Sequence, residues 1–117
     1  MLYTKLQETI KPISIDSEGT FKYIQILIEP ADPNDKNTGS EKYLIVRGWQ
    51  ECAFHADVLE KFQYEEMQNE GELNFAYTSS CPGGGRISHD PETKNIVIYG
   101  YSQGFGRADH SETQKIV

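Results

Sequence analysis

The chain has 117 residues, a mass of 13.3 kDa and a formal net charge of −7. This length suits a single folded domain, 1–117, and excludes a two-domain enzyme with its site between lobes. The acidic balance argues against a nucleic-acid-binding protein, which needs a basic face. No apolar run approaches the ~20 residues of a membrane span, and the N-terminus has no signal-peptide pattern. We therefore expect a cytoplasmic monomer that binds neither nucleic acid nor membrane.

The first half of the chain is predicted to hold two strands. Residues 1–10 are expected to be a loosely ordered lead-in. Residues 20–29 alternate isoleucines with other side chains, which is typical of a strand. Residues 30–40 combine proline, asparagine and charged residues and predict a surface loop. Residues 42–47 form a near-continuous apolar run, which favours a central strand covered on both faces.

The strongest helical signal lies in residues 52–69. Large apolar side chains recur there at a spacing of four residues, at Phe54, Val58 and Phe62, which indicates a helix with one buried face. Gly71 follows at the position where a glycine commonly ends a helix.

The second half is predicted to add strands and one short helix. Residues 73–78 are expected to form a strand and residues 81–85 a loop. A turn at the Asp-Pro pair predicts a hairpin over residues 86–99. Asp109 is a suitable N-cap for a short helix that ends near Ile116. Together these elements predict an α/β (α+β) domain, with a mixed sheet of about five to six strands and two helices packed on it.

The segment from Cys81 to Arg86 invites comparison with cysteine-dependent phosphatases. Its four intervening residues are one short of the spacing that lets a loop wrap a phosphate around a thiolate, so we do not expect Cys81 to be a nucleophile. Three consecutive glycines indicate either a plain turn or a backbone that approaches another group closely. Arg86 suits bidentate binding of phosphate. Cys81 and Cys52 are expected to be reduced thiols.

His55 lies where an extended segment gives way to the predicted helix. Helix N-termini attract anions and favour a neutral imidazole. A neutral imidazole beside bound phosphate can act as a base or as a nucleophile; the alternative is that His55 only caps the helix or lies exposed. The histidines at 55, 89 and 110 and the cysteines have no metal-ligand spacing, so we expect no metal and no cofactor.

A glycine-rich loop, residues 100–106, follows the last predicted strand. Glycines and a serine at the end of a strand are typical of an anion-binding loop, because ligands collect where strands end. The loop lacks the dinucleotide-binding register and the P-loop lysine, which argues against a nucleotide fold. A plain glycine-rich turn is the alternative.

Five segments together resemble one protein family. They are FKYI at 21–24, IVRG at 45–48, FHADVLEK at 54–61, GGGRISH at 83–89 and YGYSQGFG at 99–106. In order and spacing they resemble the 14 kDa phosphohistidine phosphatases, the Janus family, from about Asp16 to about His110.

The resemblance implies a small α/β fold and a phosphatase that removes phosphate from phosphohistidine in proteins without a metal. It assigns His55 to the catalytic position and Lys22 to that of a substrate-binding lysine. The other residues that it implies for phosphate binding are the backbone N–H of Ala56, the side chain of Arg86, and the loop residues Ser102, Gln103 and Gly104. The implied partners are phosphohistidine-containing proteins.

Two other interpretations stay open at this point. Phe54 stands where the family often has tyrosine, which removes a hydroxyl beside the site. A catalytically weak relative that binds phosphoproteins is therefore an alternative. The second alternative is an unrelated small scaffold with a coincidental glycine loop. For a phosphatase, His55 acting as general base and His55 acting as nucleophile are both open.

Overall fold

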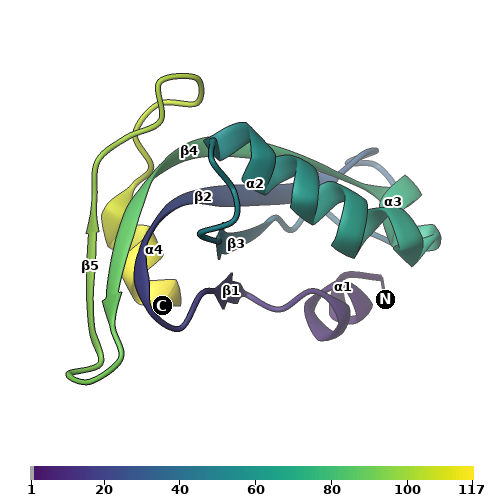
Figure 1. Ribbon diagram of the computed structural model, residues 1–117. Coiled ribbons are helices and arrows are strands. Elements are labelled where there is room, and N and C mark those ends of the chain that lie inside the picture. The colour runs from purple at the N-terminus through teal and green to yellow at the C-terminus, as the bar shows by residue number, and fades with distance from the viewer. Residues whose placement is uncertain (1) are drawn as a thin grey trace.

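A strongly curved five-stranded sheet is the centre of the computed structural model, which describes residues 2–117 (Figure 1). The strand order is β1-β3-β2-β4-β5. Only the β1–β3 pair is parallel, and the other neighbours are antiparallel, so the sheet is mixed. The strands are β1 (Ile13–Ile15), β2 (Gly19–Pro30), β3 (Tyr43–Gly48), β4 (Tyr77–Asp90) and β5 (Asn95–Tyr99).

Helices cover both faces of this sheet (Figure 1). They are α1 (Leu2–Thr9), α2 (His55–Phe62), α3 (Glu72–Ala76) and α4 (His110–Ile116). A π-helical turn (Gln63–Met67) and a 3₁₀ turn (Gln68–Glu70) continue α2. The predicted α+β domain with a mixed sheet is confirmed, and the described chain carries α1 and α3 in addition to the two predicted helices. No helix within residues 2–117 is long and apolar enough to cross a bilayer.

Alternation along β2 divides the core into two clusters. Ile24, Ile26 and Ile28 are fully buried on the face covered by α1 and α2. Phe21 and Tyr23 are buried on the opposite face, which α4 covers. Successive side chains of a strand point to opposite faces, so even-numbered residues of β2 face α2 and odd-numbered ones face α4. Both predicted strands of the first half, residues 20–29 and 42–47, are confirmed, and β3 lies inside the sheet as expected.

Three predicted segments are wrong. The predicted loose lead-in covers residues 1–10; Met1 lies outside the described residues, but Leu2 and Leu6 lie on one face of α1 and are buried in the core. Most of the predicted strand 73–78 is helix α3, which buries Leu73. The predicted loop 81–85 lies inside the long strand β4. In each case tertiary burial overrides a local propensity.

The predicted helix 52–69 begins three residues later, at His55, and its last two turns are π and 3₁₀ rather than α. Gly71, with φ +48°, ends this helical run as expected. The predicted hairpin 86–99 is confirmed, with Asp90 paired to Asn95 at its end. The predicted cap is also confirmed, because the Asp109 carboxylate accepts hydrogen bonds from two backbone N–H groups at the start of α4.

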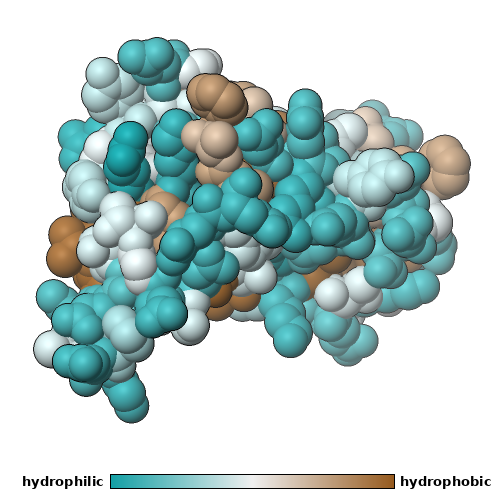
Figure 2. All heavy atoms as spheres, viewed as in Figure 1, coloured by the Kyte–Doolittle hydropathy of each residue, from teal (hydrophilic) through white to brown (hydrophobic). Residues whose placement is uncertain are grey.

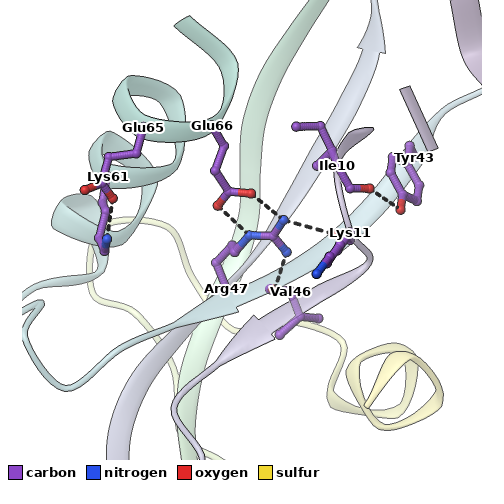
Figure 3. A network of polar contacts seen from close by, with 8 residues as sticks. All are labelled: Ile10, Lys11, Tyr43, Val46, Arg47, Lys61, Glu65 and Glu66. Atoms are coloured by element: carbon purple, nitrogen blue, oxygen red, sulfur yellow. Dashed lines mark hydrogen bonds and ion pairs between the residues drawn. The ribbon is translucent and has the colours of Figure 1, made fainter. Parts of the chain in front are cut away.

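A buried arginine fixes the far end of the α2 segment to the sheet (Figure 3). Arg47 on β3 is fully buried and donates two hydrogen bonds of 2.8 Å to the carboxylate of Glu66 in the π turn. It also donates to the backbone carbonyls of Lys11 and Val46. Breaking a buried ion pair of this kind costs roughly 3–5 kcal/mol. The pair therefore joins the burial of Val58 and Phe62 in holding the helix that begins at His55 on the sheet.

Candidate active site

A cavity of about 720 Å³ lies between the first turn of α2 and the loop after β5. Figure 2 shows hydrophobic side chains gathered in this region, between the loop and the start of the helix. All seven site residues expected from the sequence line the cavity: Lys22, His55, Ala56, Arg86, Ser102, Gln103 and Gly104. Elements far apart in the chain thus bring the expected residues to one place.

The sheet positions the two cations of the cavity. Lys22 on β2 is opposite Arg86 on β4 in the strand register, and both side chains lie on the face that α2 covers. The Lys22 ammonium also lies 5.2 Å from the centroid of the Phe54 ring, which is 65% exposed at the rim. Among the lining residues of the described chain there is no carboxylate. In a protein of net charge −7, this local excess of positive charge favours an anionic ligand.

His55 is the first residue of helix α2, and one edge of its ring contacts β4. Its Nε2 is 2.9 Å from the carbonyl oxygen of Gly85. A carbonyl can only accept, so a neutral His55 carries its proton on Nε2 and donates it there. The Cδ2–Nε2 edge of the ring faces the strand, as a Cβ built on Gly84 would lie 2.7 Å from Cδ2. Nδ1 is therefore left with a free lone pair, and no residue in 2–117 hydrogen-bonds to it.

The surroundings of His55 keep its imidazole neutral. Burial is the main cause that lowers the pKa of His55 below the usual 6.5. The hydrogen bond to the Gly85 carbonyl acts in the opposite direction, and the positive charges of Lys22 and Arg86 lower the pKa further. The sequence predicted a neutral imidazole from the helix terminus, whereas burial is the larger cause of the lowered pKa.

The three consecutive glycines of β4 let neighbouring groups approach the backbone closely; they do not form a turn. A Cβ on Gly83 would lie 2.6 Å from the backbone nitrogen of Ala108, and one on Gly84 would meet the His55 ring. A Cβ on Gly85 would lie 2.5 Å from the carbonyl oxygen of Tyr99. None of the three has a positive φ, so contact and not backbone conformation requires glycine here. Of the two alternatives that the sequence left open, close approach is the correct one.

Backbone N–H groups reach the cavity from two sides. At the start of α2, the Phe54 N–H donates to the Asp57 carboxylate and the Asp57 N–H to the Phe54 carbonyl. The N–H of Ala56 has no acceptor within residues 2–117, as expected in a first helical turn. The N–H groups of Gln103 and Gly104 likewise have no acceptor among the described residues.

The loop that presents the Gln103 and Gly104 N–H groups is closed on itself and pinned to β4. Ser102 and Gly106 exchange two backbone hydrogen bonds of 3.0 and 2.8 Å, and the Ser102 hydroxyl accepts from the Phe105 N–H. The Gly106 carbonyl also accepts from the Gly84 N–H on β4. The far end of the loop is therefore held against the same glycine segment that holds His55.

Cys81 does not line the cavity. It lies on β4 beside a bulge, where the register with β2 shifts between Gln25 and Leu27. Burial raises the pKa of the Cys81 thiol to about 11, and its Sγ donates to the Gly83 carbonyl. A thiol in this state is a poor nucleophile, in agreement with the expectation from its spacing to Arg86.

Sequence reasoning missed the aromatic wall of the cavity. Besides Phe54, it is lined by Tyr99, Tyr101 and Phe105, of which Tyr101 is 62% exposed. The sequence signal for them was the position of these aromatic residues in and around a glycine-rich loop. A loop of this kind offers few buried apolar residues for them to pack against. Within residues 2–117 no group of three or more His, Cys, Asp or Glu side chains is arranged to hold a metal ion.

Comparisons with known proteins agree with these features. The family model of the Janus/Ocnus family matches residues 7–117. The chain is 39% identical to the sex-regulated protein janus-A of Drosophila melanogaster over 105 residues, which cover 90% of this chain and 68% of that protein. It is 44% identical to the 14 kDa phosphohistidine phosphatase of Sus scrofa over 108 residues, which cover 92% and 80% of the two chains. The chain therefore belongs to the Janus/Ocnus family.

Proposed function

We propose that this protein is a protein-histidine phosphatase that hydrolyses the P–N bond of phosphohistidine. One observation carries the proposal: the neutral His55 has a free Nδ1 in a cavity that contains two cations, free backbone N–H groups and no carboxylate among its lining residues. A relative that is 44% identical bears the name 14 kDa phosphohistidine phosphatase, which supports the same activity.

In the proposed reaction the phosphoryl oxygens are bound by the N–H groups of Ala56, Gln103 and Gly104 and by the charges of Lys22 and Arg86. These groups neutralise the charge of the phosphoryl group and orient it, and such positioning and electrostatics provide most of the catalysis in phosphoryl transfer. Lys22 and Arg86 project from paired strands, and the loop of Gln103 and Gly104 is closed by backbone hydrogen bonds, so these backbones are in position before the substrate binds.

His55 Nδ1 performs the chemical step in either of two ways. As a general base it takes a proton from water while the water oxygen bonds to phosphorus. As a nucleophile it bonds to phosphorus itself, and water then hydrolyses the phosphoenzyme. In both cases the P–N bond breaks, and its electron pair stays on the nitrogen of the leaving imidazole. Both routes need a neutral His55, which the lowered pKa provides.

A second candidate function is a phosphoprotein-binding module of the same fold with weak catalysis. It is favoured by Phe54, whose ring lies at the rim of the cavity and provides no hydroxyl group beside the site. The binding groups would be the same, and only turnover would be missing.

The test is release of inorganic phosphate from a phosphohistidine peptide, with a phosphoserine peptide as the control substrate. We expect release from phosphohistidine by the wild type, at an equal rate in buffer with EDTA, because Lys22 and Arg86 provide the positive charge. Binding of the phosphohistidine peptide without release would contradict the phosphatase and support the binding module.

A further inference from the structure

His110 lies on the opposite face of the glycine segment from His55. It is the first residue of α4, and its ring packs on Gly85, whose Cβ would lie 2.7 Å from the His110 Cε1. Its Nε2 is 2.8 Å from the carbonyl oxygen of Gly100, and its Nδ1 is 2.6 Å from the hydroxyl of Tyr23. Both ring nitrogens are therefore engaged, one by the loop at the cavity and one by the core.

The groups around His110 can form a chain in which each group donates a hydrogen bond to the next. The Gly100 carbonyl only accepts, so Nε2 donates to it and Nδ1 of the neutral ring accepts from Tyr23. Tyr23 is fully buried, and burial raises the pKa of its hydroxyl, so it keeps the proton that it donates. Tyr23 in turn lies 3.0 Å from the hydroxyl of Thr113, which accepts from the amide of Gln25. The chain of hydrogen bonds thus begins in the core at Gln25 and ends in the exposed contact to Gly100.

Gly100 is the point where β5 becomes the cavity loop. It has a φ of +78° and itself lines the cavity, immediately before the residues that present the free N–H groups of Gln103 and Gly104. Contacts between Ser102, Gly106 and β4 hold the far end of this loop. The hydrogen bond from His110 is the corresponding contact at the near end.

We propose that His110 is a positioning residue for the candidate site. By linking the Gly100 carbonyl to hydrogen bonds that continue into the core, it fixes the near end of the loop and places the N–H groups of Gln103 and Gly104 toward the phosphoryl group. The kinetic consequence rests on the proposed function, whereas the effect on the loop and on phosphate binding does not.

Two amide substitutions separate the two contacts of His110. In His110→Gln the side-chain amide nitrogen reaches the position of Nε2 and can donate to Gly100. In His110→Asn the shorter side chain reaches only the position of Nδ1 and can contact Tyr23. His89→Ala is the matched control, because the half-buried His89 side chain hydrogen-bonds to the Asp16 carbonyl and does not line the cavity.

Three measurements are made on each full-length variant and on the wild type. They are amide hydrogen exchange of residues 101–106, the dissociation constant for inorganic phosphate, and kcat and KM for a phosphohistidine peptide. Melting temperatures identify variants that lose stability as a whole. We expect His110→Asn to accelerate exchange in the loop, weaken phosphate binding and lower kcat/KM by about 10–100-fold, because a small displacement of binding groups has effects of this size. His110→Gln should restore most of each property, and His89→Ala should match the wild type.

The outcomes that overturn the proposal are distinct from failure of the proposed function. Equal behaviour of the Gln and Asn variants, whether both match the wild type or both lose stability and activity, would show that the contact to Gly100 does not position the loop. If the wild type releases no phosphate from phosphohistidine, the phosphatase proposal fails. Loop exchange and phosphate affinity then still decide: unchanged values in His110→Asn overturn the role of His110, and changed values that His110→Gln restores support it.

Discussion

Two histidines lie against the same glycine segment of β4, one on each face, and they differ most in what their Nδ1 atoms contact. His55 and His110 each hold a backbone carbonyl through Nε2, that of Gly85 and that of Gly100. Nδ1 of His110 is occupied by the Tyr23 hydroxyl, whereas Nδ1 of His55 has no partner in the described chain. The same tautomer is therefore compatible with two different roles, because an Nδ1 that accepts a hydrogen bond from a buried hydroxyl has no lone pair left to take up a proton. In the proposed function, His55 differs from His110 because it lines the cavity and its Nδ1 lone pair is free.

The largest effect is expected from His55→Gln. Glutamine can donate to the Gly85 carbonyl as Nε2 does, but it has no basic nitrogen to replace Nδ1. We expect phosphohistidine hydrolysis to fall by at least ~10²–10⁴-fold, the contribution typical of a general base, while circular dichroism and the melting temperature stay near the wild type. Glutamine should therefore fail at position 55 and rescue at position 110. A folded variant with most of its activity would make His55 a structural residue.

Gly84→Ala tests the close contact between the His55 ring and β4. The new Cβ would lie 2.7 Å from both the His55 ring and the backbone oxygen of Tyr23, so strand or ring must shift. We expect a loss of stability of about 1–3 kcal/mol in denaturant unfolding, typical of overpacking, together with loss of activity. Gly104→Ala is the control for stability, because nothing lies within 4 Å of its Cβ. Equal stability of the two variants would contradict the close approach.

Lys22→Ala should show whether Lys22 contributes to substrate binding or to the chemical step at His55. Lys22 lies in the cavity as a point charge on a flexible side chain, which helps the bound substrate and the transition state alike. We expect KM to rise by about tenfold or more, since a hydrogen bond to a charged group contributes roughly 1.5–3 kcal/mol, with little change in kcat. Steady-state kinetics on the phosphohistidine peptide measure this. A collapse of kcat at unchanged KM would mean that Lys22 acts only in the transition state.

The pH dependence sharpens the same comparison. The pKa of His55 is lowered in the folded protein, so the ring stays neutral as the pH falls through the usual ~6.5. We expect the acid limb of kcat/KM to have its midpoint below that value, and Lys22→Ala to move the midpoint upward. Over the same range the unfolded chain binds more protons, so this group costs stability as the pH falls below ~6.5. A midpoint at or above 6.5 would contradict a buried, neutral His55.

The smallest effect is expected from Cys81→Ser. The thiol lies outside the cavity and is neutral at physiological pH, because burial raises its pKa to about 11. Activity should stay close to that of the wild type in the phosphate-release assay. A loss as large as that of His55→Gln would restore a thiolate mechanism and remove the distinction between the two faces of β4.

Much of the local structure could be predicted from the sequence. The alternation in residues 20–29 and the turn before Asn95 determine β2 and the hairpin, because pleat and turn geometry act on neighbouring residues. Asp109 caps α4 for the same local reason. The glycines at 83–85 misled prediction, since glycine is a local signal for a loop and the groups that require it belong to other elements: α2, β2, β5, and α4 with the segment just before it.

The candidate residues of the site were also indicated by the sequence, through the resemblance and the position of His55 at a helix start. Only the tertiary structure decided that His55 keeps Nδ1 free, and that His110 contacts the loop from behind. Both facts depend on which carbonyl each ring meets, and in both cases it belongs to another element: Gly85 on β4 for α2, and Gly100 at the end of β5 for α4. Contacts of this kind leave no periodic trace in a sequence, because the partners share neither a helix nor a strand.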